Sequence, residues 1–167
     1  MKTLKQLMTT CHSKRCKENP NIQPSYIPVR KYEDKTANGL TKAIIRWFEL
    51  LGMQAERVNN MGIYKKGLSY IDVLGQKIEK KGKYIKGGGT NGTADIHATA
   101  FGRSIKIEVK IGNDRQSEAQ KLYQSKIEQS GGIYIIARSF EQTITELETK
   151  CDQLQAEIKK FSDIDNF

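Results

Sequence analysis

Two short segments near the middle of the chain, residues 93–100 and 104–111, alternate apolar and polar side chains. A period of two is typical of a β-strand that buries one of its faces. Residues 101–103, with a glycine at the centre, are few enough to join these strands in a tight hairpin. Because a hairpin decides which side chains share a face, these two segments constrain the fold more strongly than any other part of the sequence.

The polar face of this hairpin carries an unusual set of charges. Lys106, Glu108 and Lys110 project from one face of the second strand, although Glu and Lys are uncommon in strands. In the first strand, Asp95 and His97 share a face. We therefore expect the hairpin to bring Asp95 close to Glu108, with Lys110 beside them.

Two neighbouring carboxylates suggest a site for a cation. They repel and raise each other's pKa unless a cation lies between them. Mg²⁺ takes oxygen ligands, keeps several waters, and can polarise a phosphate or a water. Lys110 would then orient an attacking water or offset developing negative charge. The structural alternative makes Asp95 a turn residue, and Glu108 and Lys110 a solvated strand face or a cross-strand ion pair.

The first half of the chain predicts one helix and further strands. Residues 40–51 place apolar side chains at helical spacing, and Gly52 is a suitable stop. Residues 53–58 predict a short strand. Residues 68–84 mix Ile and Val with lysines, which indicates strands or a hairpin.

The second half of the chain completes the fold class. Ser117 and Gln120 form a capping-box pattern that opens a helix to about residue 130. Residues 133–137 are a short apolar run typical of a buried strand, and after the crossover helix this strand would lie parallel to the Glu108 strand. The order of elements predicts an α/β fold with a mixed central sheet flanked by helices.

The two ends of the chain are predicted to differ in structure. Residues 1–36 contain all three prolines and no sustained period, which predicts a basic, irregular N-terminal arm ahead of a domain at 37–141. Residues 142–167 predict a C-terminal amphipathic helix that packs on the domain or on a second copy. Its heptad seam consists of Ile144, Leu147, Cys151, Leu154, Ile158 and Phe161.

Charge favours a polyanionic partner, and the alternative is a soluble protein with many surface lysines. The first 94 residues carry eighteen Lys and Arg against seven Asp and Glu, and basic side chains release counterions from phosphates. No apolar run is long enough to span a membrane, and the basic N-terminus lacks the apolar core of a signal peptide. With an odd number of cysteines, we expect a cytoplasmic protein without membrane association. Cys11, His12 and Cys16 are one ligand short of a structural zinc site, and chance thiols are the favoured interpretation unless a dimer supplies more ligands.

The order of motifs resembles a known nuclease family. Asp95 followed by the triplet Glu108-Val109-Lys110 resembles the D…(D/E)xK core of the PD-(D/E)xK nuclease superfamily. Residues 115–123 resemble the R-x-S-x-x-Q-x-x-aromatic segment of its VRR-NUC branch. Residues 92–95 resemble the G-x-x-D lead-in of that branch, and residues 131–138 resemble its next strand. The similarity covers about residues 40–141.

The resemblance implies a restriction-endonuclease-like fold and a metal-dependent nuclease. Asp95, Glu108 and the Val109 carbonyl would bind Mg²⁺ or Mn²⁺, and Lys110 would position the nucleophilic water. Gln120 would face the site, although the residue is equally well explained as the capping partner of Ser117. The substrate would be branched, flapped or junction DNA in phage or mobile-element replication, recombination or repair. Paired cuts at a junction would call for a homodimer.

One departure from the family lies in the first helix. Relatives carry a Glu near its start that supports the metal, whereas residues 38–42 here contain no carboxylate. Glu33 and Asp34 come earlier, and Glu49 comes late. This departure motivates an alternative function, a non-catalytic DNA-binding module that keeps the fold.

Contacts with DNA are expected from basic and polar side chains around the site. Phosphate contacts position a protein without reading sequence, so we expect preference for DNA structure over base sequence. The lysine-rich hairpin could track the DNA backbone, or its lysines could simply be solvated. The residues expected to bind nucleic acid are Arg57, Asn59, Lys83, Lys86, Lys106 and Arg115.

Overall fold

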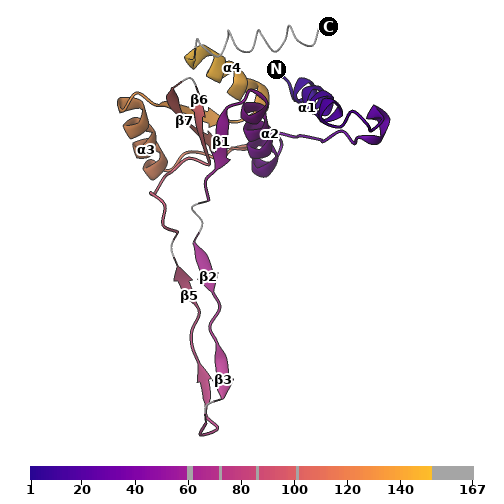
Figure 1. Ribbon diagram of the computed structural model, residues 1–167. Helices are drawn as coiled ribbons and strands as arrows, with labels where there is room; N and C mark the ends of the chain where they lie inside the picture. The colour runs from indigo at the N-terminus through magenta and orange to yellow at the C-terminus, as the bar shows by residue number, and fades with distance from the viewer. Residues whose placement is uncertain (60–61, 72, 86, 101, 152–167) are drawn as a thin grey trace.

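A four-stranded sheet forms the centre of the computed structural model, which describes residues 1–59, 62–71, 73–85, 87–100 and 102–151 (Figure 1). Its strands lie in the order β1 (Gln54–Arg57), β6 (Ile96–Ala100), β7 (Arg103–Val109) and β8 (Ile133–Ala137). The first three are antiparallel and β8 runs parallel to β7. The predicted mixed sheet, the central hairpin and the parallel last strand are therefore confirmed.

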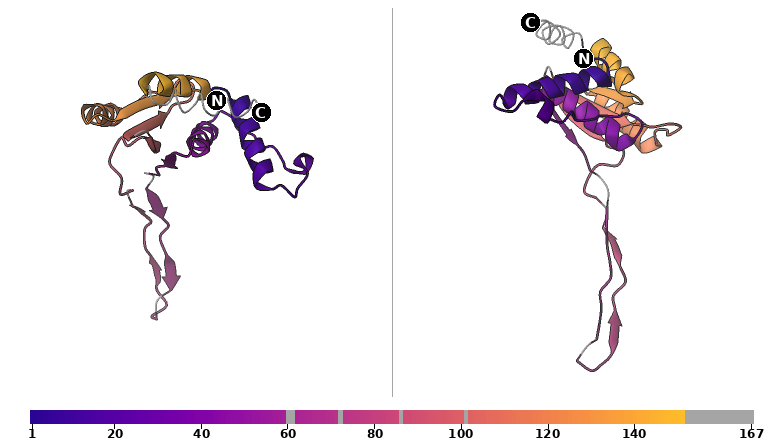
Figure 2. Two further views of the ribbon diagram at one scale, coloured as in Figure 1. Left: turned by 45° about the horizontal axis from the view of Figure 1, so that its top comes forward. Right: turned by 90° about the vertical axis from the view of Figure 1, so that its right-hand side faces the viewer.

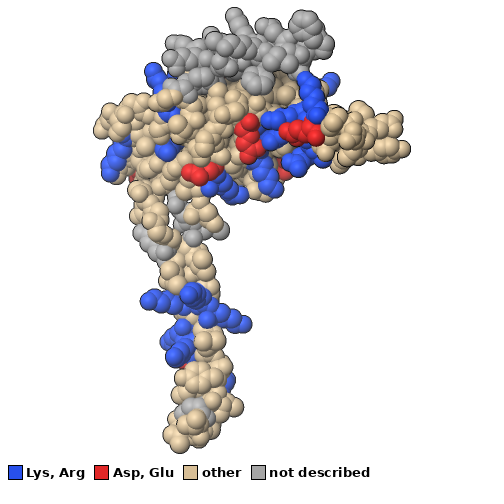
Figure 3. Space-filling model, in the orientation of Figure 1, with Lys and Arg blue, Asp and Glu red and all other residues tan. Residues whose placement is uncertain are grey.

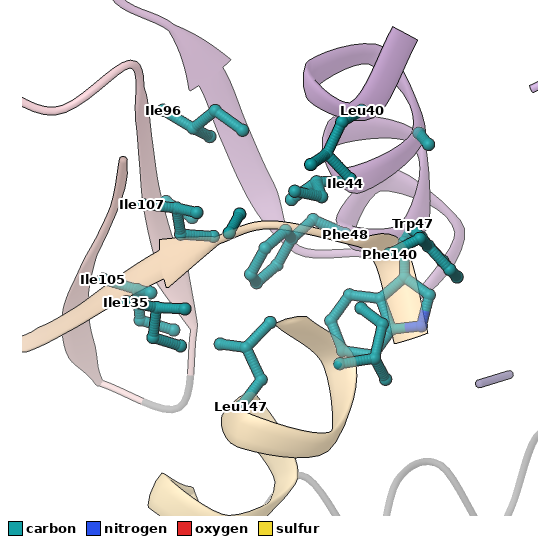
Figure 4. Close-up of a cluster of buried hydrophobic side chains, with 14 of the residues drawn as sticks. Leu40, Ile44, Trp47, Phe48, Ile96, Ile105, Ile107, Ile135, Phe140 and Leu147 are labelled. Atoms are coloured by element: carbon teal, nitrogen blue, oxygen red, sulfur yellow. The ribbon is translucent and has the colours of Figure 1, made fainter. Parts of the chain in front are cut away.

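Helices cover both faces of the sheet. Helices α2 (Ala37–Leu50) and α4 (Phe140–Lys150) pack on the apolar face, where Figure 4 shows their side chains meeting those of the strands. Helix α3 (Glu118–Gln129) lies on the other side, and its Tyr123 ring contacts Tyr134 of β8. The apolar face is therefore closed by two helices, and the polar face that carries Glu108 is covered in part by α3. The fully buried side chains of this core include Leu40, Ile44, Trp47, Phe48, Ile96, Ile105, Ile107, Ile135, Phe140 and Leu147.

Local signals explain where the helices begin and end. Thr36 caps α2, and Gly52 follows its last turn with a positive φ of 73°, as the sequence predicts. Ser117 and Gln120 form a complete capping box at the start of α3. Ser139 caps α4 by accepting a hydrogen bond from the backbone of Gln142. No helix in the described part of the chain combines the length and the apolar composition needed to cross a bilayer.

The N-terminal segment differs from the irregular arm that the sequence predicts. Residues Leu4–Glu18 form helix α1, which begins with a capping box between Thr3 and Gln6. Leu7 and Cys11 are buried in the main core, and the Trp47 indole donates a hydrogen bond to the Met1 carbonyl at 3.0 Å. The prediction was wrong because few apolar residues at helical spacing stand out among the lysines, and because all three prolines follow the end of the helix.

The C-terminal seam packs on the domain over the residues that the structure describes. Ile144 and Leu147 are fully buried, and Cys151 joins the same core. The rest of the predicted seam, Leu154, Ile158 and Phe161, lies outside the described residues. Within the described residues, α1 and α4 thus contribute side chains to the same hydrophobic core as the central sheet.

A long two-stranded ribbon stands out from the sheet between β1 and β6. We call residues 63–85 the ribbon. Its strands pair antiparallel, β2 (Ile63–Lys65) with β5 (Lys83–Ile85) and β3 (Ser69–Ile71) with β4 (Lys77–Glu79). Figures 1 and 2 show it projecting away from the helices and the sheet. The prediction of strands or a hairpin at 68–84 is confirmed.

We predict that the substitution Leu7→Ala lowers the free energy of unfolding by about 2–4 kcal/mol, because it leaves a cavity between α1 and α2. The matched control on the same helix is Lys5→Ala, at an exposed position, which should change stability by less than about 0.5 kcal/mol. Urea unfolding of the two variants measures both values. Equal stabilities would show that α1 does not dock on the domain.

Candidate active site

Strand register brings Asp95 and Glu108 to the same face of the sheet. Strand β6 pairs with β7 so that Ile96 lies opposite Ile107 and His97 opposite Lys106. Asp95 directly precedes β6 and therefore faces Glu108. Its Oδ2 accepts a hydrogen bond from the Val109 backbone at 2.9 Å, and its carbonyl accepts one from Val58 at 2.8 Å. The backbones on both sides thus hold Asp95 in place.

Glu108 is a buried carboxylate with one occupied oxygen and one open oxygen. Its exposed fraction is 2%. Its Oε1 lies 3.2 Å from the Lys110 ammonium and accepts a hydrogen bond from the Gln120 amide. Its Oε2 is buried and has no hydrogen-bond partner among the described residues. Burying a carboxylate is costly unless its oxygens are bonded or a cation compensates its charge.

The electrostatics of this group agree with its geometry. The pKa of Glu108 is raised from near 4.5 to about 7, first by burial and then by the negative charge of Asp95, against the opposing effect of Lys110. Burial alone would lower the pKa of Lys110. Its hydrogen bond and charge interaction with Glu108, and those with Asp114 at 3.3 Å, outweigh burial and raise that pKa. Lys110 therefore stays a cation at neutral pH.

A close backbone approach positions Gln120. Gly92 has a φ of +79°, and a Cβ at this residue would lie only 2.2 Å from the Ala119 carbonyl. The glycine-rich segment before Asp95 can therefore pass directly against the first turn of α3, as only glycine permits. A hollow of about 250 Å³ lies between this segment and α3, lined by Gly92, Ser117 and Gln120 among others. Gln120 both completes the capping box of Ser117 and donates to Glu108, so the two roles expected for it coexist.

The donor set fits a hard divalent cation that keeps most of its waters. Asp95 and Glu108 offer carboxylate oxygens, and Oε2 of Glu108 is buried without a partner among the described residues. Val109 directly follows Glu108 in the sequence, and its backbone N–H donates to Asp95. Mg²⁺ is commonly bound through one or two carboxylates together with waters and phosphate. Across the residues that the structure describes, no three His, Cys, Asp or Glu side chains are grouped to hold a metal ion. Waters and substrate oxygens would complete the ligand set of a Mg²⁺ ion held by Asp95 and Glu108.

The carboxylates considered as substitutes for the family's first-helix Glu make contacts of their own. Glu33 accepts a hydrogen bond from Thr36, and Asp34 accepts one from the Phe140 backbone at the start of α4. Glu49 pairs with Arg46 at 3.0 Å.

The predicted phosphate contacts are spread over several surfaces. Lys106 lies on the Glu108 face, directly opposite His97, and burial lowers the pKa of both side chains. Arg57 points toward α2 and donates to the Asn38 amide oxygen at 2.9 Å. Arg115 and Asn59 are exposed. Lys83 is exposed on the ribbon, and Lys86 lies outside the described residues.

The cysteines near the N-terminus do not converge. Cys11 is buried against α2, where its sulfur accepts from Arg46 at 3.4 Å and lies 3.9 Å from the Tyr32 hydroxyl. Cys16 lies 3.6 Å from the His12 ring, one turn along α1. Cys11 therefore has different contacts from His12 and Cys16.

Two side chains at the site were not anticipated from the sequence. Asp114 forms an ion pair with Lys110 from the loop after β7. Tyr134 is buried on the Glu108 face, and its pKa is raised by burial and by the charge of Glu108. Side chains alternate between the two faces of β8, and Tyr134 pairs with Lys106 of β7. This alternation was the signal that could have placed Tyr134 on the Glu108 face. Asp114 had no periodic signal because it lies in a loop.

We predict that ionisation of Glu108 destabilises the metal-free protein. The folded state retains a proton on Glu108 that the unfolded state loses near pH 4.5, so stability should fall as pH rises from 4.5 to 7 and stay lower above it. The loss is up to about 3 kcal/mol. Urea unfolding between pH 5 and 8 in EDTA measures it. Glu108→Gln should flatten this fall, and parallel curves for the two proteins would contradict the assignment.

No protein-family model matches the chain, and a search of curated proteins finds no match. The geometry of the Asp95–Glu108–Lys110 group, together with the ordered motifs, therefore carries the functional argument.

Proposed function

We propose that the protein is a Mg²⁺- or Mn²⁺-dependent deoxyribonuclease related to the VRR-NUC branch of the PD-(D/E)xK superfamily. One observation carries the proposal: the buried Glu108 carboxylate lies beside Asp95 and leaves Oε2 without a partner, while a lysine cation adjoins its other oxygen. A solvated strand face would not bury these charges. A simple ion pair with Lys110 explains Oε1 but leaves Oε2 and the neighbouring Asp95 unexplained.

Asp95, Glu108 and the Val109 carbonyl would hold the cation. When bound, it would offset phosphate charge and lower the pKa of a water. Gln120 assists by donating to Oε1, which orients the Glu108 carboxylate and leaves Oε2 as an acceptor that would be available to the cation. The carboxylate oxygens of the site are thus already oriented, and little rearrangement would be needed to bind a cation.

Lys110 acts in this proposal as a hydrogen-bond donor and a fixed positive charge. Its raised pKa keeps the ammonium protonated, so it is unsuited to act as a general base at neutral pH. Held by Glu108 and Asp114, it orients the attacking water and stabilises negative charge on the phosphate in the transition state. The water oxygen forms a bond to phosphorus, and the bond between phosphorus and the leaving sugar oxygen breaks. The attacking water loses a proton to solvent, and the leaving oxygen takes up a proton from solvent.

The substrate in this proposal is DNA chosen by shape. The net charge of +9 favours a polyanion, and contacts with phosphates do not read bases. We propose branched, flapped or junction DNA, in phage or mobile-element replication, recombination or repair in the cytoplasm of a bacterial or infected host cell. A homodimer would provide the two active sites that paired cuts require.

A second candidate is DNA binding without cleavage. It is favoured by the engagement of Glu33, Asp34 and Glu49 in contacts elsewhere, which leaves two carboxylates for the cation. The same experiment separates the two candidates.

We predict that Glu108→Gln, Asp95→Asn and Lys110→Met each reduce metal-dependent cleavage at least about a hundredfold, because each removes a charge that acts in the transition state. Cleavage of linear, flap and four-way DNA with Mg²⁺ or Mn²⁺ is the measurement, and binding in EDTA should persist. Glu118→Gln is the matched control, since the Glu118 side chain is 88% exposed on α3. Wild-type cleavage by the Glu108→Gln variant would contradict the proposal, and binding without cleavage by the parent protein would favour the second candidate.

A further inference from the structure

The ribbon is stabilised mainly from within. Its strands pair Tyr64 with Tyr84 and Lys65 with Lys83, and in Figure 2 it stands clear of the domain in both views. An isolated two-stranded ribbon is marginally stable in water. Because the side chains of this long ribbon are mostly exposed, we expect it to be stabilised by a binding partner.

Glycines allow the two halves of the ribbon to approach closely. A Cβ on Gly82 would lie 2.0 Å from the Tyr64 hydroxyl, and one on Gly62 would lie 2.3 Å from the Tyr84 ring. Each tyrosine thus lies over a glycine that directly precedes the opposite strand. At Gly67 the two backbones come so close that a Cβ would meet the Lys80 carbonyl at 1.7 Å. The two halves of the ribbon therefore lie directly against each other at these glycines.

Residues 63–70 and 77–85 of the ribbon, which we call the stem, are strongly basic. The register places Lys65 directly opposite Lys83, and like charges at paired positions destabilise a sheet unless an anion lies between them. Within the described part of the ribbon, Glu79 is the one acidic side chain, and it pairs with Lys77. Figure 3 shows lysine side chains projecting from the stem with little opposing charge. The exposed lysines are Lys65, Lys66, Lys77, Lys80, Lys81 and Lys83.

Exposed apolar side chains lie at the far end of the ribbon, where the sequence also contains Asp72. Val73 is fully exposed and Leu74 is 80% exposed at the turn between β3 and β4, next to the exposed Ile71. Exposed apolar side chains gathered at one place mark a binding surface. Here they lie beyond a stem of lysines, so the partner offers negative charge along its length and an apolar surface at the point that the tip reaches.

We propose that the ribbon lies in the minor groove of duplex DNA beside the cleavage site, with its lysines on the phosphates and Val73 and Leu74 as an apolar wedge at a base step. Grooves of DNA accept β-ribbons, and apolar side chains inserted from the minor groove unstack and kink a step. Strands of about ten residues reach about 35 Å, roughly one turn of the duplex. The inference rests on the proposed function for its choice of DNA, and it adds a binding element separate from the active site.

The lysine stem is tested by the salt dependence of binding to a linear duplex. Lys65→Gln with Lys83→Gln should weaken binding about tenfold or more and reduce the slope of log affinity against log salt by about 1.8. The matched control removes two exposed lysines of α1, through Lys5→Gln with Lys14→Gln, and should keep the parent slope. All proteins carry Glu108→Gln and are measured in EDTA, so that cleavage does not interfere. An unchanged slope in the ribbon variant would overturn the proposal.

The tip is tested with a duplex that contains 2-aminopurine, whose fluorescence rises when its step unstacks. Binding of the parent protein should raise the signal. Val73→Ser with Leu74→Ser should remove more than half of the rise while keeping the salt slope. No rise with the parent protein would overturn the wedge.

Sedimentation and cleavage separate the remaining interpretations. If the tip variant converts a dimer into a monomer and binds duplex DNA as the parent does, the ribbon is a self-association element and the proposal fails. Ribbon-dependent binding by a chain that cleaves no DNA would support the ribbon and overturn the nuclease. Cleavage of DNA together with binding that does not depend on the ribbon would support the nuclease and overturn the proposal for the ribbon.

Discussion

The carboxylate of Glu108 is the constraint on which the polar side of the structure depends. It is buried, it lies next to a second carboxylate, and one of its oxygens has no partner within the described residues. A buried charge of this kind costs several kcal/mol unless a cation compensates it. Lys110 compensates part of the charge, and a divalent cation held with Asp95 would compensate the rest.

Several ordinary structural features converge on that carboxylate. The antiparallel register brings Asp95 across from it, the Ser117 capping box fixes the first turn of α3, and Gly92 lets the preceding segment pass close enough for Gln120 to reach Glu108. Stability and function are opposed at this point. The folded metal-free protein favours protonated Glu108, whereas the proposed function needs it ionised, so binding of a cation would relieve the strain of ionisation.

Features with a short sequence period could be predicted. The alternation along the two middle strands identified the shared face of Asp95 and Glu108, and the capping patterns at Ser117 and Ser139 located the starts of α3 and α4. Features without such a period could not. Helix α1 has few apolar residues to mark its buried side, and Asp114 reaches Lys110 from a loop. The mixture of Ile and Val with lysines in the ribbon indicated strands. It gave no sign that the ribbon projects from the sheet, because projection depends on how the rest of the chain packs.

The central claim is that Asp95 and Glu108 share one hard cation. Crystals of the full chain soaked in Mn²⁺ would test it through anomalous scattering. The account predicts a peak within coordination distance of Asp95 and of Glu108 Oε2, and no peak at this position in Glu108→Gln crystals. A parent crystal with no peak there, or with Mn²⁺ bound only at other residues, would contradict it.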